Sequence, residues 1–297
     1  MNNTYLWRPA AALWHRDVVR FLRQRNRIIS ALVTPLVFWV LLGAGFSPSF
    51  RPAGGEAISY LTYFFPGTLV LIMLFTAIFS TISVIEDRRE GFLQGVLVAP
   101  VSPGAIVLGK FLGGTTLAAG QSLLFCVLAP FAGVSFPLHL LPALAASFFL
   151  VGFSMTGLGF LVAWPMDSTQ GFHAIMNVVL MPMWMVSGAL FPLPAGHSII
   201  GWIGAINPVT YGVSAIRQSL GGPAVAGMPS LGLSLLVTLG FCIVTYAASY
   251  RLVSHRKKAG QSSLESEARK TNVLLRSLLL AIGLFMLFII LKTCSAH

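Results

Sequence analysis

The chain has 297 residues, of which 56% are hydrophobic and only 9% are charged, against roughly 25% charged residues in a soluble domain. A mean hydropathy of +0.83 excludes an ordinary soluble protein, because so apolar a surface must be solvated by lipid. The net charge of +11 does not indicate a nucleic-acid partner, since the basic residues lie in short clusters beside apolar runs, where they can orient membrane spans. The three scattered cysteines have no disulfide or metal-ligand spacing, and we expect no metal site.

Residues 1–27 are predicted to form a cytoplasmic tail with an amphipathic helix in the stretch LWHRDVVRFLRQRNR. An apolar face that contains Trp opposite a basic face is typical of a helix lying in the membrane surface against anionic lipid. A solvated cytosolic helix is the alternative, but the sequence predicts no soluble domain on which it could pack. The apolar positions are Leu13, Trp14, Val18, Phe21 and Leu22, and the basic positions are Arg16, Arg20, Arg23 and Arg27.

Apolar runs near the length of about 20 residues that spans a bilayer predict an all-α, polytopic membrane protein. A stretch broken by Gly and Pro, 196–220, is predicted to be re-entrant and shielded by neighbouring helices. Most Lys and Arg residues fall inside if the N-terminus is cytoplasmic, so the positive-inside rule sets that orientation. The runs lie at 28–46, 58–85, 105–134, 139–164, 171–191, 229–250 and 273–291.

The stretch PGAIVLGKF (103–111) matches the phosphate-loop pattern G-x-x-x-x-G-K-[ST] up to Lys110. Phe111 stands where that pattern needs a hydroxyl for Mg²⁺. The residues between the glycines are apolar and open the run at 105–134, with no strand before them. We therefore expect Lys110 to reach the inner headgroups and the chain to have no nucleotide site of its own.

The loop after the second run, IEDRREGFLQGVLVAPVSPGAIVLGK (85–110), contains a charged turn followed by a short amphipathic segment with Phe92, Leu93, Val96 and Leu97. Pro100 ends this helix. A short helix with exposed Phe and Leu can fit a groove on a soluble partner, or it can lie on the membrane surface. The residues alone leave both alternatives open.

The run acidic-Arg-x-Glu-Gly-Phe-Leu, continuing through Leu-Val-Ala-Pro-Val-Ser to Ile-Val-Leu-Gly-Lys, resembles the coupling-helix signature of type-2 ABC exporter permeases, nearest the drug-export and nodulation-factor-export branch. SGALFPLP (187–194) and INPVTYGVSAIRQSL (206–220) resemble the broken extracellular segment of that family. The resemblance covers about residues 10–255 and implies a six-span permease domain at 28–252 with a coupling helix at 86–100. The implied ATPase-docking residues are Glu86, Asp87, Arg88, Glu90, Gly91, Phe92, Leu93, Leu97 and Pro100.

The chain departs from this family pattern in two places. Gln94 and Gly95 stand where the family often carries a second acidic residue, and Gly91 and Gly95 each weaken the helix by roughly 1 kcal/mol relative to Ala. The seventh run, 273–291, follows a polar linker at 253–272 and is an addition to the six-span core. It would place Cys294 outside.

The resemblance implies a transporter subunit rather than an enzyme, with separate ATPase subunits that bind ATP and Mg²⁺, a second permease chain and membrane lipids as partners. A homodimer is expected, and pairing with a different permease chain is the alternative. The resemblance also implies export of a lipophilic or amphiphilic substrate. An ion-coupled carrier or channel is the alternative, but the first six runs have essentially no charged interior residue to bind a coupling ion. Asn177 either faces a substrate route or bonds to a neighbouring helix. The candidate path or gate residues are Asn177, Asn207, Pro208 and Tyr211.

Overall fold

The computed structural model describes residues 4–47, 50, 59–193, 198–222, 225 and 227–259. All regular structure in these ranges is helical, in agreement with the all-α prediction. The predicted seventh span at 273–291, most of the linker 253–272 and Cys294 lie outside the described residues.

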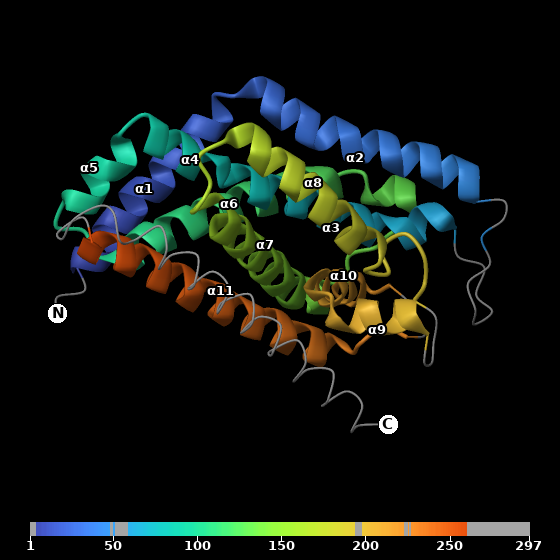
Figure 1. The fold of residues 1–297 in the computed structure, drawn as a ribbon. Helices are drawn as coiled ribbons and strands as arrows, with labels where there is room; N and C mark the ends of the chain where they lie inside the picture. The colour runs from blue at the N-terminus through green and yellow to red at the C-terminus, as the bar shows by residue number, and fades with distance from the viewer. Residues whose placement is uncertain are drawn as a thin grey trace.

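The helices form an elongated bundle (Figure 1). Two short helices, α4 and α5, lie at one end of it, and α9 and α10 lie at the other (Figure 1). In chain order the elements are α1 Thr4–Leu22, α2 Arg25–Phe46, α3 Tyr60–Ser80, α4 Ile82–Arg89, α5 Phe92–Val98, α6 Pro103–Cys126, η1 Ala129–Ala132, η2 Leu138–Leu140, α7 Leu141–Ala163, α8 Thr169–Met185, α9 Ile199–Ile206, α10 Pro208–Ser219 and α11 Leu231–Ala259.

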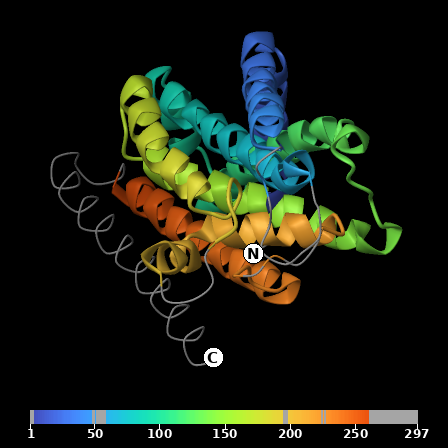
Figure 2. The same ribbon diagram turned by 90° about the vertical axis from the view of Figure 1, so that its right-hand side faces the viewer.

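The central helix is α3, which packs on α2, α6, α7 and α10. It is apolar all round, as expected for a helix surrounded by others, and Phe64, Leu69 and Ile72 are fully buried. Small residues allow the close approach of its neighbours: a Cβ on Gly114 of α6 would lie 2.5 Å from the Thr156 hydroxyl of α7. By contrast, α2 packs mainly on α3 and stands off the rest of the bundle (Figure 2).

Three helical stretches of the described residues are long and apolar enough to cross a bilayer, namely Tyr60–Arg89, Leu138–Ala163 and Leu231–Arg256. Ala31–Phe46 is a shorter apolar helix. The run predicted at 105–134 is divided, because α6 ends at Cys126 and the short helix η1 follows. The chain therefore has several apolar helices compatible with a polytopic membrane protein.

The predicted broken stretch consists of α9 and α10, which meet at an angle of 81°. Asn207 is the last residue before the bend, and its side chain accepts a hydrogen bond from the Val209 backbone N–H at 3.0 Å. Pro208 then occupies the first position of α10. A residue before proline is driven out of the helical region, and Asn is a favourable N-cap, so these two residues end one helix and begin the next.

Candidate functional site

The candidate coupling segment is a reversal of the chain between α4 and α6. Gly91 has φ = 77°, a left-handed conformation that favours glycine, and it separates α4 from α5. Ala99 is extended and ends α5, and the Ser102 hydroxyl then accepts a hydrogen bond from the Ala105 N–H at the start of α6. The sequence thus builds a short helix that projects at one end of the bundle.

The two faces of α5 differ in exposure. Leu93 is buried in the core, and Leu97 is half-buried. Phe92 and Pro100 are exposed, and Val98 is 83% exposed. The helix turns Leu93 inward and leaves Val98 outward, whereas the sequence led us to expect an exposed Leu93.

The carboxylate of Asp87 is completely buried at the end of α4, where it meets three cations. Arg16 binds it through two bonds, Nη2 to Oδ1 at 2.6 Å and Nη1 to Oδ2 at 3.0 Å. Arg20 Nη1 lies 2.9 Å from Oδ1, and Lys110 Nζ lies 2.6 Å from Oδ2. Asp87 was predicted to contact an ATPase. In the structure its side chain is fully buried, and its ion pairs join α4 to α1 and α6.

Lys110 is buried in the same cluster. Its amine also lies 2.9 Å from a carboxylate oxygen of Asp17 and 3.1 Å from the hydroxyl of Ser83. The expectation that Lys110 reaches the lipid headgroups is wrong, because two buried carboxylates hold it inside. The residues that match the phosphate-loop pattern lie within helix α6 rather than in a loop.

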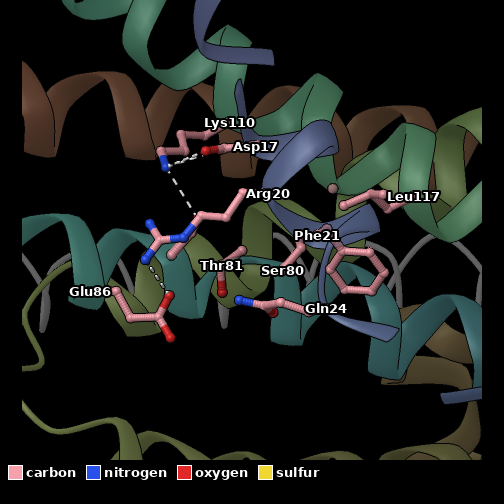
Figure 3. A pocket seen from close by; sticks show the side chains of 11 residues that line it. Asp17, Arg20, Phe21, Gln24, Ser80, Thr81, Glu86, Lys110 and Leu117 are labelled. Carbon is pink, nitrogen blue, oxygen red and sulfur yellow. Dashed lines mark hydrogen bonds and ion pairs between the residues drawn. The ribbon is translucent and has the colours of Figure 1, made fainter. Parts of the chain in front are cut away.

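A small cavity adjoins these charges (Figure 3). Its volume is about 20 Å³, the size of about one water molecule. Figure 3 shows Lys110 directed toward Asp17, and Arg20 directed toward Glu86; Arg20 Nη2 lies 3.1 Å from a Glu86 oxygen and 3.1 Å from a Glu90 oxygen. The cavity suits a bridging water and is too small for a transported organic molecule.

Arg16 also contacts the exposed side of α5. Its guanidinium carbon lies 3.6 Å from the centre of the Phe92 ring, a cation–π contact. The hydrogen bond to Asp87 raises the pKa of Arg16 above its usual value, although burial opposes the shift. Arg16 therefore connects the buried carboxylate of Asp87 with the Phe92 ring of α5.

Helix α1 is the predicted amphipathic helix, but its partner is α6. Leu13 and Phe21 are buried, and the indole of Trp14 donates to the Thr116 hydroxyl at 3.0 Å. Gly109 of α6 permits this packing, since a Cβ there would lie 2.7 Å from the Ala10 carbonyl oxygen.

The predicted division of α1 into two faces therefore changes. Arg16 and Arg20 point into the protein, while Leu22 and Arg23 are exposed and Val18 is half-buried. The side chain of Arg27 lies outside what the structure describes. The amphipathic pattern was real, but it did not reveal that α6 covers one face.

Arg88 connects the candidate coupling segment to α7. Its guanidinium donates to the carbonyl oxygens of Trp164 and of Met166, the latter at 3.1 Å, and lies 3.2 Å from Asp167. These carbonyls follow the last turn of α7, where a cation is favourable. Arg88 was predicted to contact an ATPase. In the structure its guanidinium caps the free carbonyl groups at the end of α7.

The predicted path or gate residues differ in exposure, and their role in transport stays a prediction. Asn207 and Tyr211 are buried, and their side chains donate to the carbonyl oxygens of Met183 and of Ala205, the latter at 2.8 Å. Asn177 lies on the outer face of α8 beside Val178, which is 74% exposed. Pro208 is buried and is the first residue of α10.

Residues 10–220 match the family described as ABC-2 type transporter. The chain belongs to the ABC-2 type transporter family. Members of this family are membrane permeases of ABC transporters, and membership implies an ABC ATPase as partner.

Relatives support this assignment. A protein named "Putative transport permease ycf38" from Cyanophora paradoxa is 30% identical over 207 residues, 68% of this chain and 70% of that protein. Nodulation protein J from Rhizobium leguminosarum bv. trifolii is 27% identical over 247 residues, 82% of this chain and 93% of that protein. The expected resemblance to nodulation-type permeases is confirmed.

The charge cluster is the part of the site that sequence reasoning missed. A signal was present, because the chain has only 8 acidic residues and a carboxylate beside an apolar run must find a cation when buried. Asp17 and Asp87 both meet that description. The sequence could not show that α1 would bring Asp17 to Lys110 across 93 positions of the chain.

Proposed function

We propose that this ABC-2 family chain is the membrane subunit of an ATP-driven exporter, and that separate ATPase subunits dock on the exposed side of α5. The exposure of Phe92 and Val98, at the two ends of α5, carries the proposal. Val98 is 83% exposed, and Phe92 is 36% exposed although Arg16 packs on its ring, at the end of the bundle where charged residues cluster. An exposed apolar surface rimmed by polar residues is typical of a protein-binding site.

Force applied to α5 has a direct route into the bundle. Asp87 binds α1 and α6 through ion pairs, and Arg88 binds the end of α7. A displacement of α4 and α5 would therefore move these helices together. The ATPase must dock differently in two states of the permease, because a partner that binds both equally shifts no equilibrium.

The proposed membrane domain is 28–252, with spans built on α2, α3 with α4, α6, α7, α8 and α11. The bent pair α9–α10 would be a re-entrant segment, and a second copy of the chain would complete the path for a lipophilic or amphiphilic substrate. ATP and Mg²⁺ would be bound by the ATPase. Uncovered apolar faces on α2 and α8 support this arrangement: Leu41 is 65% and Val178 is 74% exposed, as expected for residues that meet lipid or another chain.

The docking proposal is tested by Val98→Asp and Phe92→Asp in the tagged full chain, purified from native membranes. A carboxylate placed in an apolar interface costs several kcal/mol, so we expect the recovered ATPase to fall by about tenfold or more. Gln94→Asp is the matched control, since it adds the same charge at an exposed, polar position of α5. Leu93→Asp should instead lower the yield of folded permease, because Leu93 faces the core.

Recovery of the ATPase at the wild-type level with both Val98→Asp and Phe92→Asp would refute docking on α5. Equal loss with Gln94→Asp would also contradict it, because the effect would then follow charge rather than the apolar contact.

A further inference from the structure

A buried arginine lies at the end of the bundle opposite α5. Arg217 is in the last turn of α10 and is 3% exposed. Within the part of the chain that the structure describes, no carboxylate pairs with it, unlike the arginines of α1. A charged side chain inside a membrane protein is costly and generally marks a functional element.

Neutral groups hold this guanidinium. Nη2 donates to the carbonyl oxygen of Gly188 at 3.2 Å, and the guanidinium carbon lies 4.0 Å from the centre of the Tyr63 ring. The Tyr63 hydroxyl donates to the same Gly188 oxygen at 2.9 Å. Among the residues that the structure describes, none accepts a hydrogen bond from the Nε–H of Arg217. The charge is therefore stabilised by the aromatic face, one shared carbonyl and the end of α10.

These contacts tie a non-helical segment to α3. Gly188 belongs to residues 187–190, between α8 and α9, and its φ of 79° favours glycine. Tyr60 of α3 donates to the Leu190 carbonyl oxygen at 3.0 Å. Ala189 sits so close to Gly67 of α3 that a Cβ on Gly67 would lie 2.8 Å from the Ala189 methyl.

The two ends of the bundle differ in how their buried charges are compensated. At the α5 end, separating Asp87 from its cations would break several charge-assisted bonds, which are the strong ones. At the α10 end, water that reached Arg217 would hydrate the whole guanidinium, including the unpaired Nε–H. That hydration would offset the loss of the Gly188 and Tyr63 contacts. We therefore expect the contacts of Arg217 to separate more easily than the ion pairs of Asp87.

We propose that Tyr63 is a latch that holds residues 187–190 against α3, and that hydration of Arg217, which packs on the Tyr63 ring, favours the opening of this latch. The assignment of this opening to the substrate-release step rests on the proposed function; the latch itself does not. Arg217 and Tyr63 act as positioning residues. Their roles are opposite: Tyr63 favours the closed arrangement, and the charge of Arg217 favours the open one.

The test uses the full chain in liposomes, with its three native cysteines replaced by alanine and a single reporter, Ser187→Cys. Ser187 is fully buried in the closed segment, so the rate of its reaction with a water-soluble thiol reagent measures opening. Tyr63→Leu should raise this rate by about tenfold, because it leaves the cation with fewer contacts. Arg217→Met should lower it, because an apolar side chain of similar size needs no water while Gly188 keeps the Tyr63 hydroxyl.

Two conservative variants and a second reporter separate the latch from simple destabilisation. Tyr63→Phe keeps the ring and should have a smaller effect than Tyr63→Leu, and Arg217→Lys should stay nearer the wild-type rate than Arg217→Met. Ser154→Cys, buried on α7, should react at an unchanged rate in every variant. Faster labelling of Ser187→Cys in both Tyr63→Leu and Arg217→Met, no change in either, or a parallel change at Ser154→Cys would overturn the latch.

Adding the copurified ATPase and ATP extends the test to transport. The Ser187→Cys rate should then rise in the otherwise unmodified chain and stay low with Arg217→Met. If no ATPase is recovered, the proposed function fails while the comparison in liposomes still decides the latch.

Discussion

Lys110 forms ion pairs with two buried carboxylates, those of Asp17 and Asp87. We predict that Lys110→Met lowers the stability of the purified permease by about 3–5 kcal/mol, because it leaves the charge of Asp17 buried without its closest cation. Thermal unfolding in detergent, followed by tryptophan fluorescence, measures the loss. The double variant Asp17→Asn with Lys110→Met should recover part of it, since the amide needs no cation. If the stability lost in the double variant equals the sum of the losses in Asp17→Asn and in Lys110→Met, the two residues are not coupled as their 2.9 Å ion pair requires.

At the residue scale, sequence reasoning selected Asp87 and Arg88 but did not identify the residues that they contact. Asp87 and Arg88 were selected as docking residues because of the family resemblance. The structure instead uses both to fasten α4 to neighbouring helices. Asp87 and Arg88 contact residues that are far away in the sequence, and a local sequence pattern does not predict such distant pairs. Val98, the most exposed apolar residue of α5, was not selected, because the sequence does not tell which face of so short a helix turns inward.

The packing of α1 on α6 depends on a glycine. We predict that Gly109→Val displaces α1, because the added Cβ would lie 2.7 Å from the Ala10 carbonyl oxygen and 2.8 Å from the Leu13 Cβ. Trypsin cleavage of the purified chain near Arg23, at the end of α1, should then become faster. Gly120→Val on the same helix is the control, since a Cβ at Gly120 meets nothing within 4 Å. Equal cleavage rates for the two variants would contradict a close α1–α6 contact.

At the scale of elements, local signals were sufficient for helix type and for the bend, but not for packing. The Gly and Pro residues of 196–220 predicted a broken stretch, and α9 and α10 do meet at 81°. The amphipathic pattern of α1 predicted a helix with one covered face. The sequence did not show that α6 covers this face, and the expected contact of α1 with membrane lipid stays a prediction.

Hydropathy predicted the order of the apolar helices along the chain, but it could not predict their neighbours. That α3 lies at the centre follows from its burial on all sides, and a long apolar run is equally compatible with lipid. The arrangement in space depends on close contacts such as that of Gly114 with Thr156, which join residues far apart in the sequence.

The orientation of the whole molecule is tested with two single-cysteine variants in otherwise cysteine-free chains. Val98→Cys on α5 and Ile199→Cys on α9 lie at opposite ends of the bundle (Figure 1), and the native side chains are 83% and 79% exposed. The positive-inside rule places the α5 end, with Arg88 and Arg89, in the cytoplasm. A membrane-impermeant thiol reagent added to intact cells should therefore label Ile199→Cys and leave Val98→Cys unlabelled until the membrane is opened. The reverse pattern would place α5 outside, where no ATP-driven partner could reach it, and would refute both the orientation and the docking proposal.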